Sequence, residues 1–518
     1  MLKKLIFCSG LIASVLTLSA CDKQTASTEV EQNRPLQVTA QWEINSLDPA
    51  KVGYVFHALQ LVETLVETDS QGNLVPGLAL SWQPEEQAKV WVVKLRPQVK
   101  FHDGTLLDAQ TVKQSLEIAL SKPTLLQNAK ITQIVVRDAL TLEFRLEQSL
   151  TSFPAYLAHT STVILAPSSF ATTQEVTQIV GTGPYKVESI EIPQKVTARA
   201  FADYWGDKAI IEQVNYLANS RAETRTLLVQ SDPSYLVYNL DYASAQRLRA
   251  NPKVVVQSKP IARTIQLKLN LAHPFLEDVE VRQVLSQAID RTAIATSLLG
   301  IPQGQAYQIL PPAYPAWQVT PATAAPDYQA LQQKLSQLGW KLNEQQQLVN
   351  AQGQEFIVTL RTFPDRAELP LIATALQDQW QKLGIKVNVA IGNASEIASG
   401  HQDGSLELAL YSRNYGSLPD PTGVLGQDYK VGGADWGAMN WQQAASFQAK
   451  LASYTSASTS ESEQKLLREQ IIQQLNEQLP MIPIVYALVN VAHGPALGGL
   501  ELDPFERTYY LSKLYWLK

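Results

Sequence analysis

The first 22 residues constrain the fold of this chain most, because they decide in which compartment the rest of it folds. Two lysines near the start precede an uncharged apolar run from Leu5 to Leu18, and small residues separate that run from Cys21. A positive start, a short apolar run and small residues at its end are typical of a secretory signal peptide, and the run is too short for an ordinary membrane-spanning helix. We therefore predict that residues 1–20 are removed and that the mature chain folds outside the cytoplasm.

The mature chain has to fold without a disulfide bond. The sequence has two cysteines, and Cys8 lies within the predicted signal peptide, so Cys21 is left alone. The 518 residues are 45% hydrophobic and 17% charged, which are globular values, and at about 100–200 residues per domain they form two to four domains. Stability must therefore come from large hydrophobic cores. The formal net charge of −6, without any run of lysine and arginine, argues against a nucleic-acid partner.

The end of the predicted signal also predicts how the mature chain is attached. Leu18-Ser19-Ala20-Cys21 resembles the lipobox of bacterial lipoproteins, which implies that Cys21 is acylated and becomes the new N-terminus. Asp22 resembles the residue that keeps such proteins at the inner membrane. The alternative is a plain secretory signal in which Cys21 is incidental. One acyl chain holds a protein only marginally, whereas several anchor it stably. We expect a lipid anchor at Cys21 on the periplasmic face of the inner membrane, and residues 21–35 as a flexible tether.

Strand and helix patterns alternate along the mature chain. Runs of β-branched and apolar residues predict strands at Leu36–Ala40, Val90–Leu95, Leu140–Leu146, Thr264–Leu271, Phe356–Leu360 and Ile385–Val389. Apolar residues at helical spacing predict helices over His57–Val66, Leu107–Leu120, Glu277–Leu299 and Leu369–Leu383. We expect Asp278 to cap the third of these helices and Gly300 to end it. Such alternation indicates an α/β fold built on a mostly parallel sheet.

A series of short segments, taken in order, carries a specific family resemblance. These segments are Ser46–Pro49, Leu74–Trp82, Leu95–Thr105, Gly181–Tyr185, Tyr204–Gly206, Asp278–Leu285 and Ala288–Arg291. Together they resemble the family 5 extracellular solute-binding proteins, which supply peptide and nickel ABC importers. Gln98 stands where the family has a glycine. The resemblance runs from about Leu36 to the C-terminus.

The resemblance implies an α/β, two-lobed periplasmic-binding-protein fold (type II-like) with an extra inserted domain and a ligand cleft between the lobes. The expected parts are a first lobe of residues 36–65, 180–260 and 487–518, an inserted domain of residues 66–179, and a second lobe of residues 261–486. We expect the chain to cross between lobes near Lys259–Arg263 and Ile484–Ala487. The resemblance further implies a monomer that closes on its ligand and delivers it to an ABC permease and ATPase complex in the inner membrane.

Several of these motifs have an ordinary structural interpretation. Gly104 is most simply a turn residue that tolerates a positive φ, and His102 is structural rather than a ligand. Gly181–Pro184 lacks the Lys-Ser/Thr pair of a phosphate loop, so we interpret it as a tight turn between lobes. Asp278 and Arg282 stand four apart on a predicted helix, a spacing that permits a surface ion pair.

The candidate ligand site lies in the segment from Leu410 to Pro421. Peptide-binding members of the family carry an aspartate where this chain has Asn414, and a neutral amide cannot pair with an α-ammonium group. Asp420 could replace that aspartate. The same segment resembles the nickel and metallophore binders, with Arg413, Tyr415, Gly416, Asp420 and Pro421 in register. That resemblance implies that Arg413 holds a ligand carboxylate through two parallel hydrogen bonds. The alternative for Arg413 is an internal salt bridge with Asp420.

A bare metal ion is not an expected ligand. The six histidines form no close cluster, and some nickel binders place a histidine where this chain has Ser412. We therefore predict no metal site made of protein groups and no cofactor, and expect any metal to be carried inside an anionic chelate.

Aromatic side chains complete the predicted site. We expect Tyr54, Phe56 and His57 in the first lobe, together with Tyr411, to line the cleft. Trp436 and Trp441 follow Gly432-Gly433 and could stand on a mobile loop. Ordinary core packing is the alternative for each aromatic residue.

Three functions are compatible with this pattern. The first is a binding protein without catalysis that takes an oligopeptide or similar small solute, or alternatively a metal chelate through Arg413. The second is a periplasmic hydrolase, but the chain has neither a Gly-x-Ser-x-Gly nor a His-Glu-x-x-His motif, so we predict no enzyme activity. The third is a ligand-sensing lipoprotein without transport.

Overall fold

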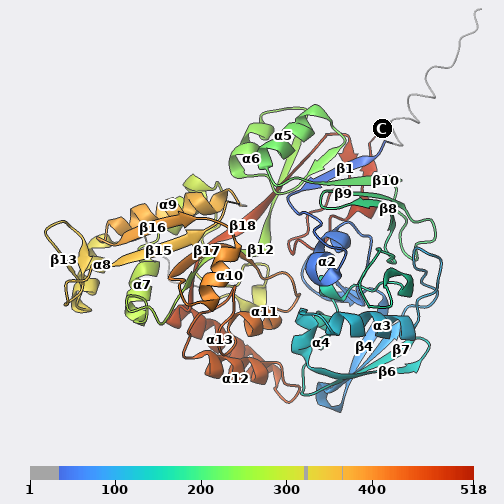
Figure 1. The fold of residues 1–518 in the computed structure, drawn as a ribbon, viewed down its shortest axis with the longest axis horizontal. Helices are drawn as coiled ribbons and strands as arrows, with labels where there is room; N and C mark the ends of the chain where they lie inside the picture. Colours follow the sequence, from blue (N-terminus) through green and yellow to red (C-terminus); the bar gives the residue numbers. More distant parts are fainter. Residues whose placement is uncertain (1–33, 320–324, 365, 518) are drawn as a thin grey trace, which may run out of the picture.

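The largest sheet of the described residues has ten strands and extends along the long axis of the molecule (Figure 1). The computed structural model describes residues 34–319, 325–364 and 366–517, so Cys21 and the predicted signal lie outside the described residues. In spatial order the strands are β16 (Lys386–Ile391), β15 (Ile357–Thr362), β17 (Leu408–Asn414), β12 (Val255–Leu269), β18 (Met481–His493), β11 (Tyr235–Val237), β1 (Leu36–Ala40), β10 (Gln213–Ala218), β9 (Lys195–Ala200) and β8 (Tyr185–Glu191). We call the end with β11, β1, β10, β9 and β8 the first half, and the end with β17, β15 and β16 the second half.

The sheet is mixed, so the predicted mostly parallel sheet is wrong. Parallel pairing is confined to β16–β15–β17 in the second half and β11–β1–β10 in the first. The other neighbours are antiparallel, because β12 and β18 form a long antiparallel pair in the middle and β8, β9 and β10 follow one another as a meander. Helix-strand alternation within each half therefore says nothing about the strands that join the halves.

Strands β12 and β18 connect the two halves (Figure 1). Their register shifts between Pro260 and Thr264. On β12, Ile261 packs in one hydrophobic core and Ala262 in the next, and on β18 the same change falls between Val485 and Ala487. Each strand therefore passes from one core to another within one or two residues.

Three large hydrophobic cores organise the described residues. The first core surrounds β1 and β10 and includes Leu36, Phe56 and Tyr216, as well as C-terminal residues as far as Trp516. The second core extends from Ala262 to Val485 and adds Phe505. The third core extends from Leu65 to Ala166 and adds Leu418. It lies beneath a separate sheet in the order β4 (Ala79–Glu85), β5 (Val90–Leu95), β7 (Thr141–Leu146) and β6 (Ile131–Asp138).

The α-helices cover these sheets. They are α2 (Pro49–Ala58), α3 (Ala109–Leu120), α4 (Phe153–Tyr156), α5 (Ala222–Ser231), α6 (Tyr242–Arg249), α7 (Val279–Gln287), α8 (Tyr328–Gln337), α9 (Glu368–Gln381), α10 (Ser395–Gln402), α11 (Thr422–Asp428), α12 (Ala444–Tyr454) and α13 (Glu461–Gln478). Short strands are β2 (Val66–Thr68), β3 (Leu74–Pro76), β13 (Lys341–Leu342), β14 (Leu348–Val349), β19 (Leu497–Gly498) and β20 (Tyr515–Trp516). Single turns of 3-10 helix occur at Glu86–Ala88, Leu125–Ala129, Thr160–Thr162, Pro167–Ser169, Pro315–Trp317 and Leu511–Lys513, and a π-helical turn at Ala293–Leu298. Within the described ranges, no helix combines the length and apolar character that crossing a membrane requires.

Two predicted helices are placed differently. The helix expected over His57–Val66 begins and ends earlier, at Pro49–Ala58 (α2). It begins there because the Asp48 side chain accepts a hydrogen bond from the Ala50 amide and Pro49 fits the first helical position. The helix expected over Glu277–Leu299 is capped by Asp278 as predicted, but it breaks into α7 and the later π-helical turn.

Arg282 does not form the surface ion pair with Asp278 that their spacing permits. Arg282 is buried, and its guanidinium donates to the carbonyl oxygens of Leu276, Glu277 and Gln478. It ties α7 to the end of α13, where four helical carbonyls lack partners within their own helix.

Candidate functional site

Arg413 is engaged inside the protein. Its Nε donates to Oδ2 of Asp428 at 2.7 Å and its Nη2 to Oδ1 at 2.6 Å, a bidentate pair with a buried carboxylate at the end of α11. Such a fork-to-fork pair uses the same edge of the guanidinium that a ligand carboxylate would use. The alternative interpretation, an internal salt bridge, holds for Arg413, but its partner is Asp428 and not the predicted Asp420.

Asp420 and Asn414 are occupied locally. Asp420 accepts hydrogen bonds from the amide and the hydroxyl of Thr422, and burial raises the pKa of its carboxyl. Asn414 Oδ1 accepts a hydrogen bond from the Gly416 amide at 2.7 Å. Each side chain therefore fixes the turn that follows it, and no contact joins Asp420 to Asn414 or Arg413 among the residues the structure describes.

Tyr411 and Tyr415 are fully buried in the second core. The hydroxyl of Tyr415 donates to Oε1 of Gln266 at 3.0 Å, and Nε2 of Gln266 donates to the hydroxyl of Tyr411 at 3.1 Å. Tyr411 in turn donates to the carbonyl of Trp436 at 2.5 Å. This chain of hydrogen bonds is a packing feature of β12 and β17.

The two tryptophans that follow Gly432-Gly433 have different surroundings. Trp436 is half-buried and packs edge-on against Tyr411 (5.3 Å between ring centroids) and Phe363 (6.3 Å). Trp441 is buried in the second core against Tyr429 and Phe447. Trp436 is therefore the more accessible of the two.

Helix α2 separates its three candidate residues by exposure. Tyr54 is 38% exposed and lies edge-on to Trp42 at 5.7 Å. Phe56 is buried in the first core. His57 is buried, with Nδ1 3.0 Å from the carbonyl of Arg507 and Nε2 3.2 Å from Glu67. Burial alone lowers the pKa of His57, but the Glu67 carboxylate outweighs it and raises the pKa above its usual value.

Aromatic and charged residues from both halves meet beside the connecting strands. We call Trp42, Tyr54, Arg263, Arg366, Glu368 and Glu506 the junction cluster. The guanidinium of Arg366 lies 5.9 Å from the ring centroid of Trp42, which is a contact between the second half and the first. Arg366 also lies 3.5 Å from Glu368, and Arg263 donates to Glu506 at 2.8 Å.

The charges of the junction cluster are unevenly paired. Burial lowers the pKa of Arg263 to about 10. The Glu506 carboxylate raises this pKa, whereas the positive charge of neighbouring Arg366 lowers it further. Nη2 of Arg366 is buried and has no hydrogen-bond partner within residues 34–319, 325–364 and 366–517. A buried donor without a partner costs about 1–3 kcal/mol, and more when it is charged. The junction cluster therefore holds one cationic donor that an additional anionic group would satisfy.

Sequence reasoning missed Trp42, Arg263, Arg366, Glu368 and Glu506. A signal for two of them was available, because Trp42 follows β1 and Arg366 follows β15, both strands with parallel neighbours. In open α/β sheets, ligands bind outside the carboxyl ends of such strands.

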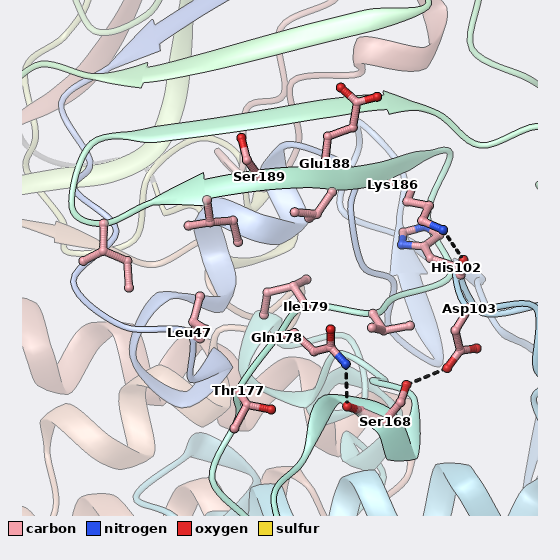
Figure 2. Close-up of a pocket in the computed structure, with 14 residues that line it drawn as sticks. Leu47, His102, Asp103, Ser168, Thr177, Gln178, Ile179, Lys186, Glu188 and Ser189 are labelled. Carbon is pink, nitrogen blue, oxygen red and sulfur yellow. Dashed lines mark hydrogen bonds between the residues drawn. The ribbon is translucent and has the colours of Figure 1, made fainter.

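A groove of about 490 Å³ runs along β8, the edge strand of the first half (Figure 2). Three hydrogen bonds join residues that line it: Lys186 Nζ donates to the His102 carbonyl at 2.7 Å, Ser168 to Asp103 at 2.5 Å, and Gln178 to the Ser168 carbonyl at 2.8 Å. All of its lining residues lie between positions 47 and 192, so it is not formed between the halves. A second groove of about 550 Å³ lies at the other edge of the sheet, beside β16.

His102 in the first groove has the structural role that the sequence indicates. Its Nε2 is 2.9 Å from the carbonyl of Gly183, and burial lowers its pKa to about 4, so the ring is neutral near pH 7. Gly104 has the expected positive φ of 87°.

The motifs Gly181–Tyr185 and Tyr204–Gly206 converge on Glu63. Its carboxylate accepts hydrogen bonds from Thr182 (2.7 Å), Tyr204 (2.8 Å) and Trp205 (2.9 Å). Burial raises the pKa of Glu63 to about 7, against the effect of these donors. A Cβ at Gly183 would lie 2.1 Å from the carbonyl oxygen of Gln60, so this glycine allows two chain segments to pack closely where the chain bends at Gly183 and Pro184.

The described part of the chain contains no group of three or more histidine, cysteine, aspartate or glutamate side chains that could hold a metal ion.

Known proteins resemble this chain over nearly its whole length. A sequence model described as "Bacterial extracellular solute-binding proteins, family 5 Middle" matches residues 73–436. The nickel-binding periplasmic protein of Escherichia coli (strain K12) is 24% identical over 512 residues, which are 96% of this chain and 97% of that protein.

Solved structures extend this likeness to the fold. The Brucella suis NikA structure with Fe(III)-EDTA is 20% identical and superposes with a TM-score of 0.86, covering 93% of this chain and all of that one. The Bacillus subtilis oligopeptide-binding protein AppA, solved with a nonapeptide, is also 20% identical, with a TM-score of 0.78 over 94% of this chain and all of that one.

Proposed function

Because the chain belongs to the family 5 bacterial extracellular solute-binding proteins, we propose that it captures a carboxylate-bearing metal chelate at the junction cluster and delivers it to an ABC importer. Membership makes it a solute-binding protein of the peptide and nickel class, which is a non-enzymatic class. The chelate is the finer proposal, and Arg366 carries it.

Arg366 supports an anionic ligand. Its Nη2 is buried without a partner in the described part of the chain, and its contact with Trp42 places it where residues of both halves meet. A ligand carboxylate would satisfy this donor with a charge-assisted hydrogen bond. Arg413, which the family resemblance favours for this role, is already paired with Asp428.

A chelate is supported over a bare ion and over a peptide. The described residues offer no cluster of metal-binding side chains, so the ligand would have to supply donors of its own. Asn414 and Asp420 are both engaged in local turns, which leaves neither free to pair with a peptide α-ammonium group. The nickel-binding relative from Escherichia coli and the Fe(III)-EDTA bound to Brucella suis NikA are consistent with this proposal.

We also propose that binding occurs by closure of two lobes. In this division the first lobe comprises residues 36–65, 180–260 and 487–518, the inserted domain residues 66–179, and the second lobe residues 261–486. The separate cores support it, although Val163, Leu165 and Ile179 pack in the first core. A ligand that contacts both lobes binds the closed form better and shifts the population toward it.

The lipid anchor remains a proposal for a residue outside the described structure. Cys21→Ser should release the protein from membranes into the periplasmic fraction, as measured by fractionation and immunoblotting. Retention of the variant in the membrane fraction would contradict an anchor at Cys21.

Native mass spectrometry of protein purified from its host without refolding tests the proposed ligand. A single metal-bearing or polycarboxylate species, lost on denaturation and absent from a parallel Arg366→Ala preparation, would support the proposal. A ladder of peptide masses that is unchanged in the variant would contradict it and favour oligopeptide transport.

A further inference from the structure

A lysine is buried beneath the loop that carries Trp436. Lys268 lies on β12, and no part of its side chain is exposed to solvent. Its Nζ donates to the carbonyl of Ala434 at 2.7 Å, the carbonyl of Asp435 at 2.9 Å and Nδ1 of His401 at 2.9 Å. An ammonium group has three hydrogens to donate, and all three have partners here.

These three contacts tie the connecting strand β12 to a helix and a loop that pack around the second core. Lys268 belongs to β12, His401 to α10, and Ala434 and Asp435 to the loop between α11 and α12. The same loop is held a second time where Tyr411 donates to the Trp436 carbonyl. Lysine is almost never buried to this extent unless it serves a specific contact.

The anchored loop packs against the connection that carries Arg366. Trp436 packs against Phe363, which follows β15 and precedes Arg366 in the same connection. Arg366 then reaches Trp42 in the first half. Contacts therefore link Lys268 through Trp436 to Phe363, in the connection that also carries Arg366.

We propose that Lys268 is a positioning residue that holds the loop of Trp436 in place, and that its protonation controls how readily this loop opens. The effect on ligand binding rests on the proposed function at the junction cluster, whereas the effect on the loop does not.

The charges around Lys268 set the direction of the pH effect. Asp435 in the loop and Asp428 on α11 face it, but Asp428 is already paired with Arg413 on β17, and His401 must be neutral to accept its hydrogen bond. Burial lowers the pKa of Lys268 to about 7, and the two aspartates only partly oppose this shift. An open loop would let water reach the amine and return its pKa toward the ordinary 10.5.

Linkage converts this difference into a measurable slope. The open form binds more protons than the closed form between pH 7 and about 10, so rising pH favours the closed loop. A single proton gives a decrease in the opening constant of up to about tenfold per pH unit above pH 7, and little change below it. Protonation therefore loosens the loop and deprotonation tightens it.

Hydrogen exchange of the ligand-free protein, read on peptides covering residues 429–439, tests this proposal. After correction for intrinsic rates, we expect exchange in the wild type to slow by up to about tenfold between pH 7 and pH 8. In Lys268→Met we expect exchange at least fivefold faster than wild type at pH 8 and no such slope. Lys382→Met, which changes an exposed lysine in the i,i+4 pair with Asp378, should behave like the wild type.

The outcomes separate the two proposals. Equal hydrogen-exchange protection of residues 429–439 in Lys268→Met and the wild type would overturn the role of Lys268. Exchange in the wild type that does not slow between pH 7 and pH 8 would also overturn it, and this measurement does not depend on whether the variant folds. If hydrogen exchange behaves as expected but the wild type does not bind a nickel–citrate probe, the role of Lys268 in holding the loop stands and the proposed chelate ligand is contradicted. Binding of the probe that weakens at least threefold in Lys268→Met would support both.

Discussion

Two regions of the molecule differ in how their charged side chains are paired: the buried polar face of β12 and β17, and the junction cluster. On the buried face, Arg413 pairs bidentately with Asp428, and Lys268 has three acceptors. In the junction cluster, Arg366 keeps one buried nitrogen without a partner in the described part of the chain. A charge satisfied within the protein stabilises a particular packing, whereas an unsatisfied one is available to a ligand. The comparison therefore separates an arginine that maintains structure from one that we propose binds the solute.

Breaking the Arg413–Asp428 pair should have the largest effect on stability. Asp428→Ala leaves a largely buried guanidinium without its counter-charge, which costs about 3–5 kcal/mol in the free energy of unfolding. Urea denaturation measures this, with Asp378→Ala, an exposed acidic residue, as the control. A loss no larger than that of the control would show that Arg413 does not depend on Asp428 and could serve a ligand instead.

Acid should destabilise the protein through Glu67. This residue lies outside both regions and gives a reference for the effect of losing one buried ion pair. Burial by itself raises the pKa of Glu67, but His57 and Arg507 outweigh it and lower the pKa to about 2. A depressed pKa means that this stability is present above pH 4.5 and is lost as pH falls from 4.5 toward 2. We expect a contribution on the order of 3 kcal/mol.

Thermal melts from pH 6 to pH 3 check this contribution. Glu67→Gln should melt lower than the wild type at pH 6, and the difference should narrow on acidification. Glu147→Gln, at an exposed position, serves as the control. A wild-type-like melting profile for Glu67→Gln would contradict the assignment of the ion pair.

Arg366→Ala should reverse the pattern of Asp428→Ala, with a loss of affinity and little loss of stability. We expect affinity for an anionic chelate to fall at least tenfold, about 1.4 kcal/mol, because the ligand loses its charged donor. Isothermal titration with nickel–citrate measures this, and Arg221→Ala, an exposed arginine before α5, is the control. Undiminished affinity together with a large loss of stability would place Arg366 among the structural arginines.

Trp42→Leu should have the smallest effect. The cation–π contact with Arg366 at 5.9 Å is worth about 0.5–1 kcal/mol. A double-mutant cycle with Arg366→Ala, measured by urea denaturation, should give a coupling energy of that size. Strictly additive effects would mean that the two residues do not interact in solution.

The sequence contained enough information for the fold but not for the site. Ordered motifs predicted an α/β binding-protein fold, and helix signals such as the Asp278 cap were read correctly. The sheet was expected to be mostly parallel, because alternation of helices and strands describes each half and not the antiparallel β12–β18 pair that joins them.

The candidate residues were chosen by residue type, and residue type does not reveal a partner. Arg413 and Asp420 stand seven positions apart in one motif, yet Arg413 pairs with Asp428 and Asp420 with its own turn. Phe56, Tyr411 and Tyr415 are buried, as their alternative interpretation allowed. Arg366 stands outside every motif, and only the arrangement in space brings it to Trp42.

A crystal structure of the protein with a nickel chelate, in which anomalous scattering locates the metal, tests the central claim most directly. The account predicts an anomalous peak between the two halves, with a chelate oxygen within hydrogen-bond distance of Nη2 of Arg366. A peak in the groove beside β8, or a chelate held by Arg413 with Asp428 displaced, would contradict it.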